Sequence, residues 1–238
     1  MNIKMILFDL DGTLLPMDMD EFIRNYFGRL AKKLASFGYD PDVLIKNIWK
    51  GTGAMLKNDG SCTNETAFWN AFSALYGEDK RKDEPIFAEY YENEFQLAKE
   101  VCGFTLKAKE TVDAIKAMGL RVALATNPIF PAIATESRIR WAGLEPDDFE
   151  FYTTYENASY SKPNPAYYQW VAEALKVRPE ECLMVGNDVD DDLPAEAIGM
   201  KVFLLTDSLI NKDNKDISVY PHGSFEELME YILKLSKQ

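Results

Sequence analysis

In the second half of the chain, short and mainly apolar segments alternate with segments of helical periodicity. The apolar segments lie at residues 120–125, 151–154, 182–185 and 202–205, and the helical patterns cover residues 108–118 and 165–175. A strand that lacks a polar face is buried on both sides, as in parallel sheets that helices cover. The alternation therefore predicts an α/β fold with a central parallel sheet between two layers of helices.

A long helical stretch separates the first predicted strand from this alternation. Residues 6–8 are strand-like, whereas residues 16–104 carry helical periodicity and almost no strand pattern. Asp40-Pro41, for example, is an N-cap followed by proline at the first helical position. We expect a catalytic core formed by residues 1–15 and 105–238, and an inserted all-helical domain formed by residues 16–104.

Several side chains of the helical stretch are candidates for either packing or substrate contact. We interpret its regularly spaced aromatic residues as the core of a helical bundle, namely Phe68, Phe72, Phe87, Tyr91 and Phe95. Residues 51–57 are candidates for substrate specificity. The basic side chains Arg24, Lys50 and Lys57 fit substrate contacts and solvent-facing helix positions equally well. The sequence does not identify the substrate or the oligomeric state.

Composition narrows the kinds of site that the chain can build. The net charge of −13 disfavours a nucleic-acid partner, although a small anionic substrate beside its own cation remains compatible. One histidine and three separated cysteines provide neither a zinc cluster nor a Ser-His-Asp triad. The apolar runs are too short for a signal peptide or a membrane span. We expect a soluble cytoplasmic protein, because unpaired cysteines suit a reducing compartment.

Polar side chains follow three of the predicted strands, where a doubly wound sheet binds its ligands. Asp9 and Asp11 follow the first strand, Thr126 and Asn127 follow another, and Asp188 begins an acidic run after a third, while Lys162 precedes a helix. Converging carboxylates repel one another unless a cation neutralises them, and oxygen ligands alone indicate Mg²⁺. A lysine and a threonine hydroxyl beside that ion suit a transferring phosphoryl group. These residues together predict phosphoryl transfer.

The motifs resemble those of the haloacid dehalogenase (HAD) superfamily, in order and over essentially the whole chain. They are Asp9-Leu10-Asp11-Gly12-Thr13, Thr126-Asn127, Lys162-Pro163 and Gly186-Asn187-Asp188. The resemblance, which is greatest to the phosphoglycolate-phosphatase-like branch, implies a Rossmann-like core, a helical cap inserted after the first motif and a Mg²⁺-dependent phosphohydrolase. It implies that Asp9 is the nucleophile and Asp11 the general acid and base. Thr126, Asn127 and Lys162 would bind the phosphoryl group, and Asp9, Asp11 (through its backbone carbonyl) and Asp188 would bind the metal.

The fourth motif departs from the pattern, because Asn187 stands where that branch usually has aspartate. Asp188 could replace it as a metal ligand, whereas counting back from Gly199 favours Asp191 as the distal acid of the motif. Asn187, Asp188, Asp191 and Asp192 therefore all remain candidates for contact with the metal.

The expected function is hydrolysis of a small phosphomonoester through an aspartyl-phosphate. A phosphomutase of the same family and a non-catalytic phosphate-binding protein on the same fold remain alternatives. Asp11 disfavours a dehalogenase, because the dehalogenases of this family lack the second acid. The helical insertion disfavours a receiver-type signalling module.

Overall fold

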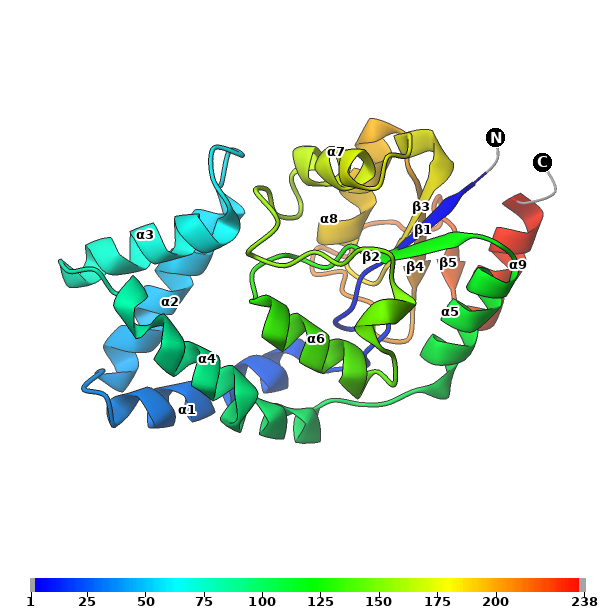
Figure 1. The fold of residues 1–238 in the computed structure, drawn as a ribbon. Coiled ribbons are helices and arrows are strands. Elements are labelled where there is room, and N and C mark those ends of the chain that lie inside the picture. Colours follow the sequence, from blue (N-terminus) through cyan, green and yellow to red (C-terminus); the bar gives the residue numbers. More distant parts are fainter. Residues whose placement is uncertain (1–2, 236–238) are drawn as a thin grey trace.

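The computed structural model describes residues 3–235 and has a three-layer α/β core (Figure 1). Its sheet has the order β2-β1-β3-β4-β5, and every neighbouring pair is parallel. The strands are β1 (Met5–Phe8), β2 (Arg121–Leu124), β3 (Cys182–Gly186), β4 (Lys201–Leu205) and β5 (His222–Gly223). The predicted α/β fold with a parallel sheet is confirmed.

Side chains of β1 alternate between two hydrophobic layers, as period-two geometry requires. Ile6 and Phe8 pack with α5 (Leu106–Ala117), α6 (Ala132–Trp141) and α9 (Phe225–Leu235). Met5 and Leu7 pack on the other face with α7 (Pro165–Ala174) and η5 (Leu193–Ile198), which follows the single turn α8 (Val189–Asp192). The sheet is therefore covered on both faces, which explains its apolar strands.

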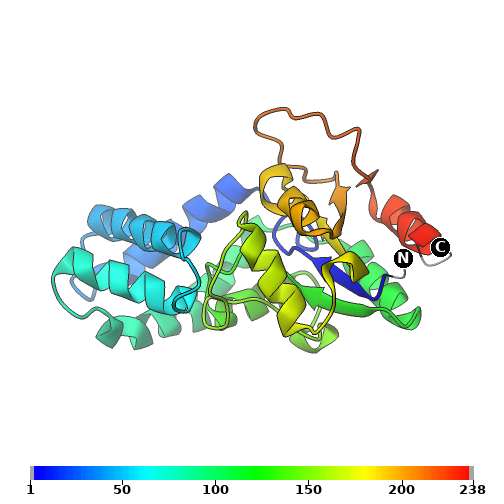
Figure 2. The same ribbon diagram turned by 90° about the horizontal axis from the view of Figure 1, so that it is seen from above.

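The helical insertion extends to one side of the sheet, at the left of Figures 1 and 2. It contains α1 (Met19–Ala35), α2 (Pro41–Leu56), α3 (Asn64–Tyr76), η1 (Arg81–Asp83), α4 (Glu84–Glu92) and η2 (Glu94–Val101). The side chains of Asp18, Asp40 and Thr63 cap the first three helices by accepting backbone N–H groups. Where the insertion joins the core, its two ends are paired: Gly103 N–H donates to the Pro16 carbonyl at 2.7 Å.

Several elements differ from the sequence expectations. Residues 151–154 form no strand, because only Tyr152 bridges to β2. The short edge strand β5, which begins at His222, has no counterpart among the predicted strands. Helix α6 has no counterpart in the sequence analysis, because it buries Thr135, Ser137 and Arg138 and so lacks a clean apolar stripe. Two short 3₁₀ turns, η3 (Pro146–Asp148) and η4 (Pro179–Glu181), complete the core.

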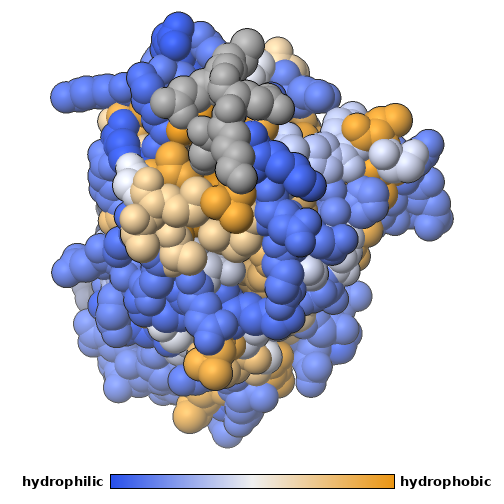
Figure 3. Space-filling model, turned by 90° about the vertical axis from the view of Figure 1, so that its right-hand side faces the viewer, coloured by the Kyte–Doolittle hydropathy of each residue, from blue (hydrophilic) through white to orange (hydrophobic). Residues whose placement is uncertain are grey.

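The surface agrees with the acidic composition. The face at the right-hand side of Figure 1 is mainly hydrophilic, with hydrophobic residues gathered in smaller areas (Figure 3). In residues 3–235, no helix combines the length and hydropathy that a membrane crossing requires.

Candidate functional site

A cavity of about 210 Å³ lies between the carboxyl ends of the central strands and the helical insertion. β1 ends before Asp9, β2 ends just before Ala125 and Thr126, and β3 is followed by Asn187. The sheet topology thus brings together side chains that lie more than a hundred residues apart. All the candidate site residues line this cavity: Asp9, Asp11, Thr126, Asn127, Lys162, Asn187, Asp188, Asp191 and Asp192.

Asp9 is held by two neighbours at the end of β1. Lys162 Nζ donates to Asp9 Oδ1 at 3.0 Å, and the Thr13 hydroxyl lies 3.4 Å from Asp9 Oδ2. That hydroxyl is closer to Asn187 Oδ1, at 2.9 Å. The turn between Asp9 and Thr13 needs glycine at residue 12, because its φ is +84° and a Cβ there would lie 2.3 Å from Asn187 Nδ2.

Lys162 is buried between two carboxylates. Its ammonium also donates to Asp192 Oδ1 at 2.6 Å, and Asp192 Oδ2 accepts the Asp188 N–H at 2.9 Å. Burial lowers the pKa of Lys162, but the charges of Asp192 and Asp9 outweigh it and hold that pKa well above its ordinary value. Lys162 therefore carries a full positive charge at the end of β1.

Asp192, rather than Asp191, is the acid that contacts this lysine. The turn of α8 returns residue 192 over the end of β3, where a Cβ on Gly186 would lie 2.0 Å from the Asp192 carboxylate. Asp191 instead accepts a hydrogen bond from Asn127 Nδ2 at 3.2 Å. Asp191, which counting back from Gly199 favours as the distal acid of the motif, therefore contacts Asn127, whereas Asp192 contacts Lys162.

Asp11 forms an ion pair with Arg138, a residue that the sequence analysis did not identify. Arg138 is 1% exposed, donates to Asp11 Oδ2 and lies 4.4 Å from the centre of the Phe130 ring. Burial raises the pKa of the Asp11 carboxyl, and the Arg138 charge opposes that rise. Asp11 Oδ1 is buried without a hydrogen-bond partner among the described residues. A single arginine in a helix without amphipathic pattern offered no sequence signal for this contact.

The polar end of the cavity offers oxygen ligands. Burial raises the pKa of Asp191, Lys162 opposes this rise, and the charges of Asp188 and Asp9 add to it, as expected where acids share one site. Within residues 3–235, no three His, Cys, Asp or Glu side chains are close enough to hold an ion by themselves. Mg²⁺ does not need such a cluster, since it keeps several waters and uses one or two carboxylates with a substrate phosphate.

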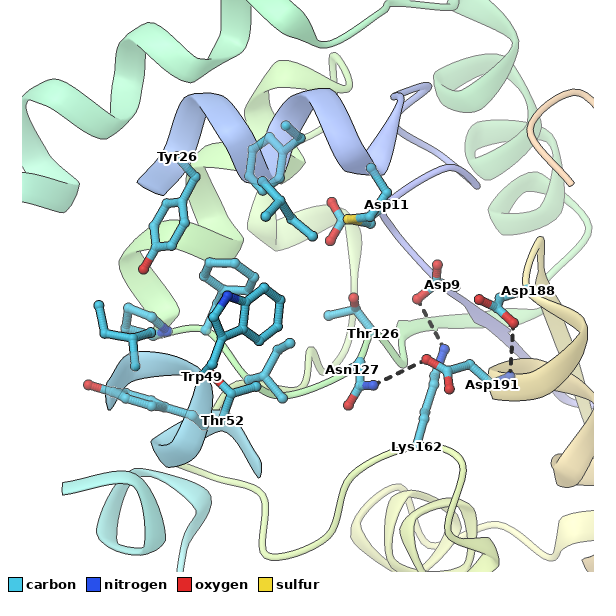
Figure 4. Close-up of a pocket in the computed structure, with 18 of the residues that line it drawn as sticks. Asp9, Asp11, Tyr26, Trp49, Thr52, Thr126, Asn127, Lys162, Asp188 and Asp191 are labelled. Atoms are coloured by element: carbon cyan, nitrogen blue, oxygen red, sulfur yellow. Dashed lines mark hydrogen bonds and ion pairs between the residues drawn. The ribbon is translucent and has the colours of Figure 1, made fainter. Parts of the chain in front are cut away.

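Two further observations fit that ion. Asn127 Oδ1 is buried and has no hydrogen-bond partner in the described part of the chain. Asp9 and Asp188 line the same end of the cavity (Figure 4). Asn187 is less available, because its amide donates to the Ser208 carbonyl and its oxygen accepts from Thr13. The donor set thus suits Mg²⁺, with Asp9 and Asp188 as the carboxylates at that end of the cavity. Asp188 Oδ1 also accepts the Asp190 and Asp191 N–H groups, which fixes the orientation of this carboxylate.

The helical insertion contributes many of the apolar side chains that line the cavity, and core residues such as Phe130 and Tyr155 add to them. Phe68, Phe87 and Tyr91 lie in the hydrophobic core, as predicted, and also line the cavity. Phe72 and Phe95 do lie in the hydrophobic core and away from the cavity. Periodicity could not distinguish these two environments.

Comparisons with known proteins agree with this geometry. A family model described as haloacid dehalogenase-like hydrolase matches residues 3–199. The chain is 26% identical to a phosphoglycolate phosphatase of Colwellia psychrerythraea, over 98% of this chain and 97% of that protein. It is also 26% identical to a glyceraldehyde 3-phosphate phosphatase of Methanocaldococcus jannaschii, over 99% of both.

A solved structure extends the likeness to the fold. The HAD-hydrolase YfnB from Bacillus subtilis, bound to magnesium, matches 98% of this chain and 100% of its own with a TM-score of 0.57 and 19% identity. The family that the sequence motifs indicate is therefore confirmed. The chain belongs to the haloacid dehalogenase-like hydrolases.

Proposed function

We propose that this protein is a Mg²⁺-dependent phosphatase that hydrolyses a small phosphomonoester through an aspartyl-phosphate. The observation that carries the proposal is the position of Asp9, which ends β1 in contact with the buried Lys162 and has Asp11 in the same cavity. A fixed cation beside a carboxylate reduces the repulsion between that carboxylate and a phosphate dianion. Asp9 is thus the best-placed nucleophile.

In the first step, an Asp9 oxygen bonds to phosphorus and the bond from phosphorus to the leaving oxygen breaks. Asp11 gives its proton to that leaving oxygen, which departs as the alcohol. In the second step, Asp11 takes a proton from water as the water attacks phosphorus, and inorganic phosphate leaves Asp9. A carboxyl must be protonated to act as a general acid. Burial favours the protonated form of Asp11 by raising its pKa, and the Arg138 charge opposes that rise.

The remaining residues bind the phosphoryl group and the ion. Lys162, Thr126 and Asn127 would contact the phosphoryl oxygens, and Asp192 would keep the Lys162 ammonium in place. Asp9, the backbone carbonyl of Asp11 and Asp188 would hold Mg²⁺, which neutralises charge on the phosphoryl oxygens when bound. We further propose that residues 16–104 act as the cap of a cytoplasmic enzyme whose partner is a small phosphorylated metabolite.

Turnover of para-nitrophenyl phosphate with and without Mg²⁺ tests this function. We expect Asp9→Asn to abolish turnover, whereas Asp207→Asn, an exposed acid outside the cavity, retains it. Acid quenching of the wild-type enzyme during turnover should trap one phosphate per chain, and none on Asp9→Asn. Equal activity of the two variants would contradict the role of Asp9. A sugar phosphate converted to its isomer without free phosphate would instead identify a mutase.

A further inference from the structure

The half of the cavity that faces away from Asp9 is built from aromatic side chains of four insertion helices. Phe22 and Tyr26 come from α1, Trp49 from α2, Phe68 from α3, and Phe87 and Tyr91 from α4. Figure 4 shows Tyr26 and Trp49 on one side of the cavity, with Asp9, Lys162 and Asp188 on the other. A phosphate bound near Asp9 would therefore direct its ester group toward these rings.

This aromatic half carries no basic side chain within the described residues. Lys162 is the one basic residue in the cavity wall of residues 3–235, and it already contacts Asp9 and Asp192. Arg24, Lys50 and Lys57, considered as substrate contacts on sequence grounds, do not line the cavity. An ester group with a carboxylate or a second phosphate would lose its water there and gain no cation, which disfavours its binding.

The polar groups of the aromatic half are neutral. The Tyr26 and Tyr91 hydroxyls hydrogen bond to each other at 2.9 Å, and Thr52 lies one helical turn from Trp49 on α2. Burial raises the pKa of Tyr26 to about 12, so its hydroxyl stays uncharged at neutral pH. These hydroxyls can hydrogen bond a neutral oxygen or nitrogen but cannot balance an anion.

Size sets a further limit on the ester group. The whole cavity measures about 210 Å³. An apolar cavity of roughly 150 Å³ is large enough to bind benzene. A single ring or a short branched chain therefore fits beside the phosphoryl position.

We propose that the substrate is the phosphate monoester of an uncharged, largely apolar alcohol about the size of one ring. This inference rests on the proposed phosphatase function and specifies its substrate class. It separates the chain from a phosphatase for phosphoglycolate, whose leaving group carries a carboxylate. Selectivity would arise from burial of the ring against Trp49 and its neighbours together with the absence of a cation.

Benzyl phosphate and phosphoglycolate form a suitable pair of probes, because both are esters of primary alcohols and differ in the group beyond the CH₂. We expect kcat/KM for benzyl phosphate to exceed that for phosphoglycolate by at least about tenfold. Calorimetric titration of Asp9→Asn with each ester in the presence of Mg²⁺ should give the same order of Kd. This titration does not depend on turnover.

Two substitutions on α2 test the wall of the cavity. Trp49 is 49% exposed and Leu56, outside the cavity on the same helix, is 44% exposed, so neither should be needed for folding. Trp49→Ala should raise the Kd for benzyl phosphate about tenfold, whereas Leu56→Ala should leave this Kd unchanged. Thr52→Lys should shift the preference toward phosphoglycolate, whereas Leu56→Lys adds the same charge outside the cavity and should not.

The outcomes separate the substrate class from the reaction. Turnover of both esters without preference, or tighter binding of phosphoglycolate, would overturn the substrate class while the phosphatase function stands. Absence of turnover together with tighter binding of benzyl phosphate would overturn the phosphatase function and support the apolar site. Equal effects of Thr52→Lys and Leu56→Lys would also overturn the inference.

Discussion

The ion pair between Arg138 and Asp11 allows a quantitative prediction. Arg138→Met keeps an apolar side chain in the same place and removes the charge that faces Asp11. Removing one partner of a buried pair typically costs about 3–5 kcal/mol, because the other charge is left uncompensated. Loss of the contact with the Phe130 ring adds about 1 kcal/mol.

Protonation of Asp11 sets an upper limit on the first of these costs. Holding a carboxyl of ordinary pKa 3.8 neutral costs about 1.36 kcal/mol for each pH unit above that value. The limit is therefore about 1.6 kcal/mol at pH 5 and about 5.7 kcal/mol at pH 8. In Arg138→Met the native state holds a proton that the unfolded chain releases, so its stability falls as pH rises through this range.

Urea denaturation in EDTA measures this effect without a contribution from divalent ions. We expect Arg138→Met to lose about 4–6 kcal/mol at pH 8 and about 2–3 kcal/mol at pH 5, relative to the wild type. In an Asp11→Asn background the loss should be smaller and independent of pH. An equal loss at both pH values, or the same loss in both backgrounds, would refute the reasoning. Arg138→Lys should restore part of the stability.

Three other predictions concern residues outside this pair. Asn64 is fully buried, and its amide donates to the carbonyls of Pro128 and Tyr160 and to the Ser161 hydroxyl. Asn64→Ala should therefore lower the free energy of unfolding, measured by urea denaturation, by about 3 kcal/mol. Asn70→Ala, at an exposed position of the same helix, should change it little. Hydrogen bonds from Arg178 and Lys4 lower the pKa of Glu181 to about 2. The stability that Glu181 contributes is therefore fully present above its ordinary pKa of 4.5 and is lost as pH falls toward 2. The difference in Tm between the wild type and Glu181→Gln should therefore shrink below pH 4.5, and a constant difference would contradict the assignment. Gly186→Ala should abolish turnover by displacing Asp192 from Lys162, whereas Gly28→Ala, with open space around its Cβ, should raise stability by about 0.5–1 kcal/mol.

The strand ends were predictable from the sequence because each signal is local. A buried strand followed by Asp9, or by Thr126, can be recognised without knowing what packs against it, and parallel topology then brings those ends together. The same local reasoning predicted the start of α2, where the Asp40 side chain caps the helix and Pro41 follows it.

The features of the site that the sequence did not predict depend on contacts between segments far apart in the chain. Arg138 and Asp11 are 127 residues apart, and helix α6 buries polar side chains that conceal its periodicity. Whether Asp191 or Asp192 contacts Lys162 depends on the path of the single turn α8 (Val189–Asp192) after β3 and on the position of Lys162, which comes from a distant segment. The orientation of Phe68 toward the cavity depends on how α3 packs against its neighbours, which periodicity does not encode.

The pairing of Gly103 with Pro16 has a consequence for how proteins of this kind can diversify. Because the chain leaves and re-enters the core at adjacent points, the number of residues between those points does not alter the distance between them. Whole helices can be gained, lost or exchanged in that excursion without straining the sheet that holds Asp9 and Lys162. Selectivity and reaction chemistry are thus free to change at separate rates during evolution.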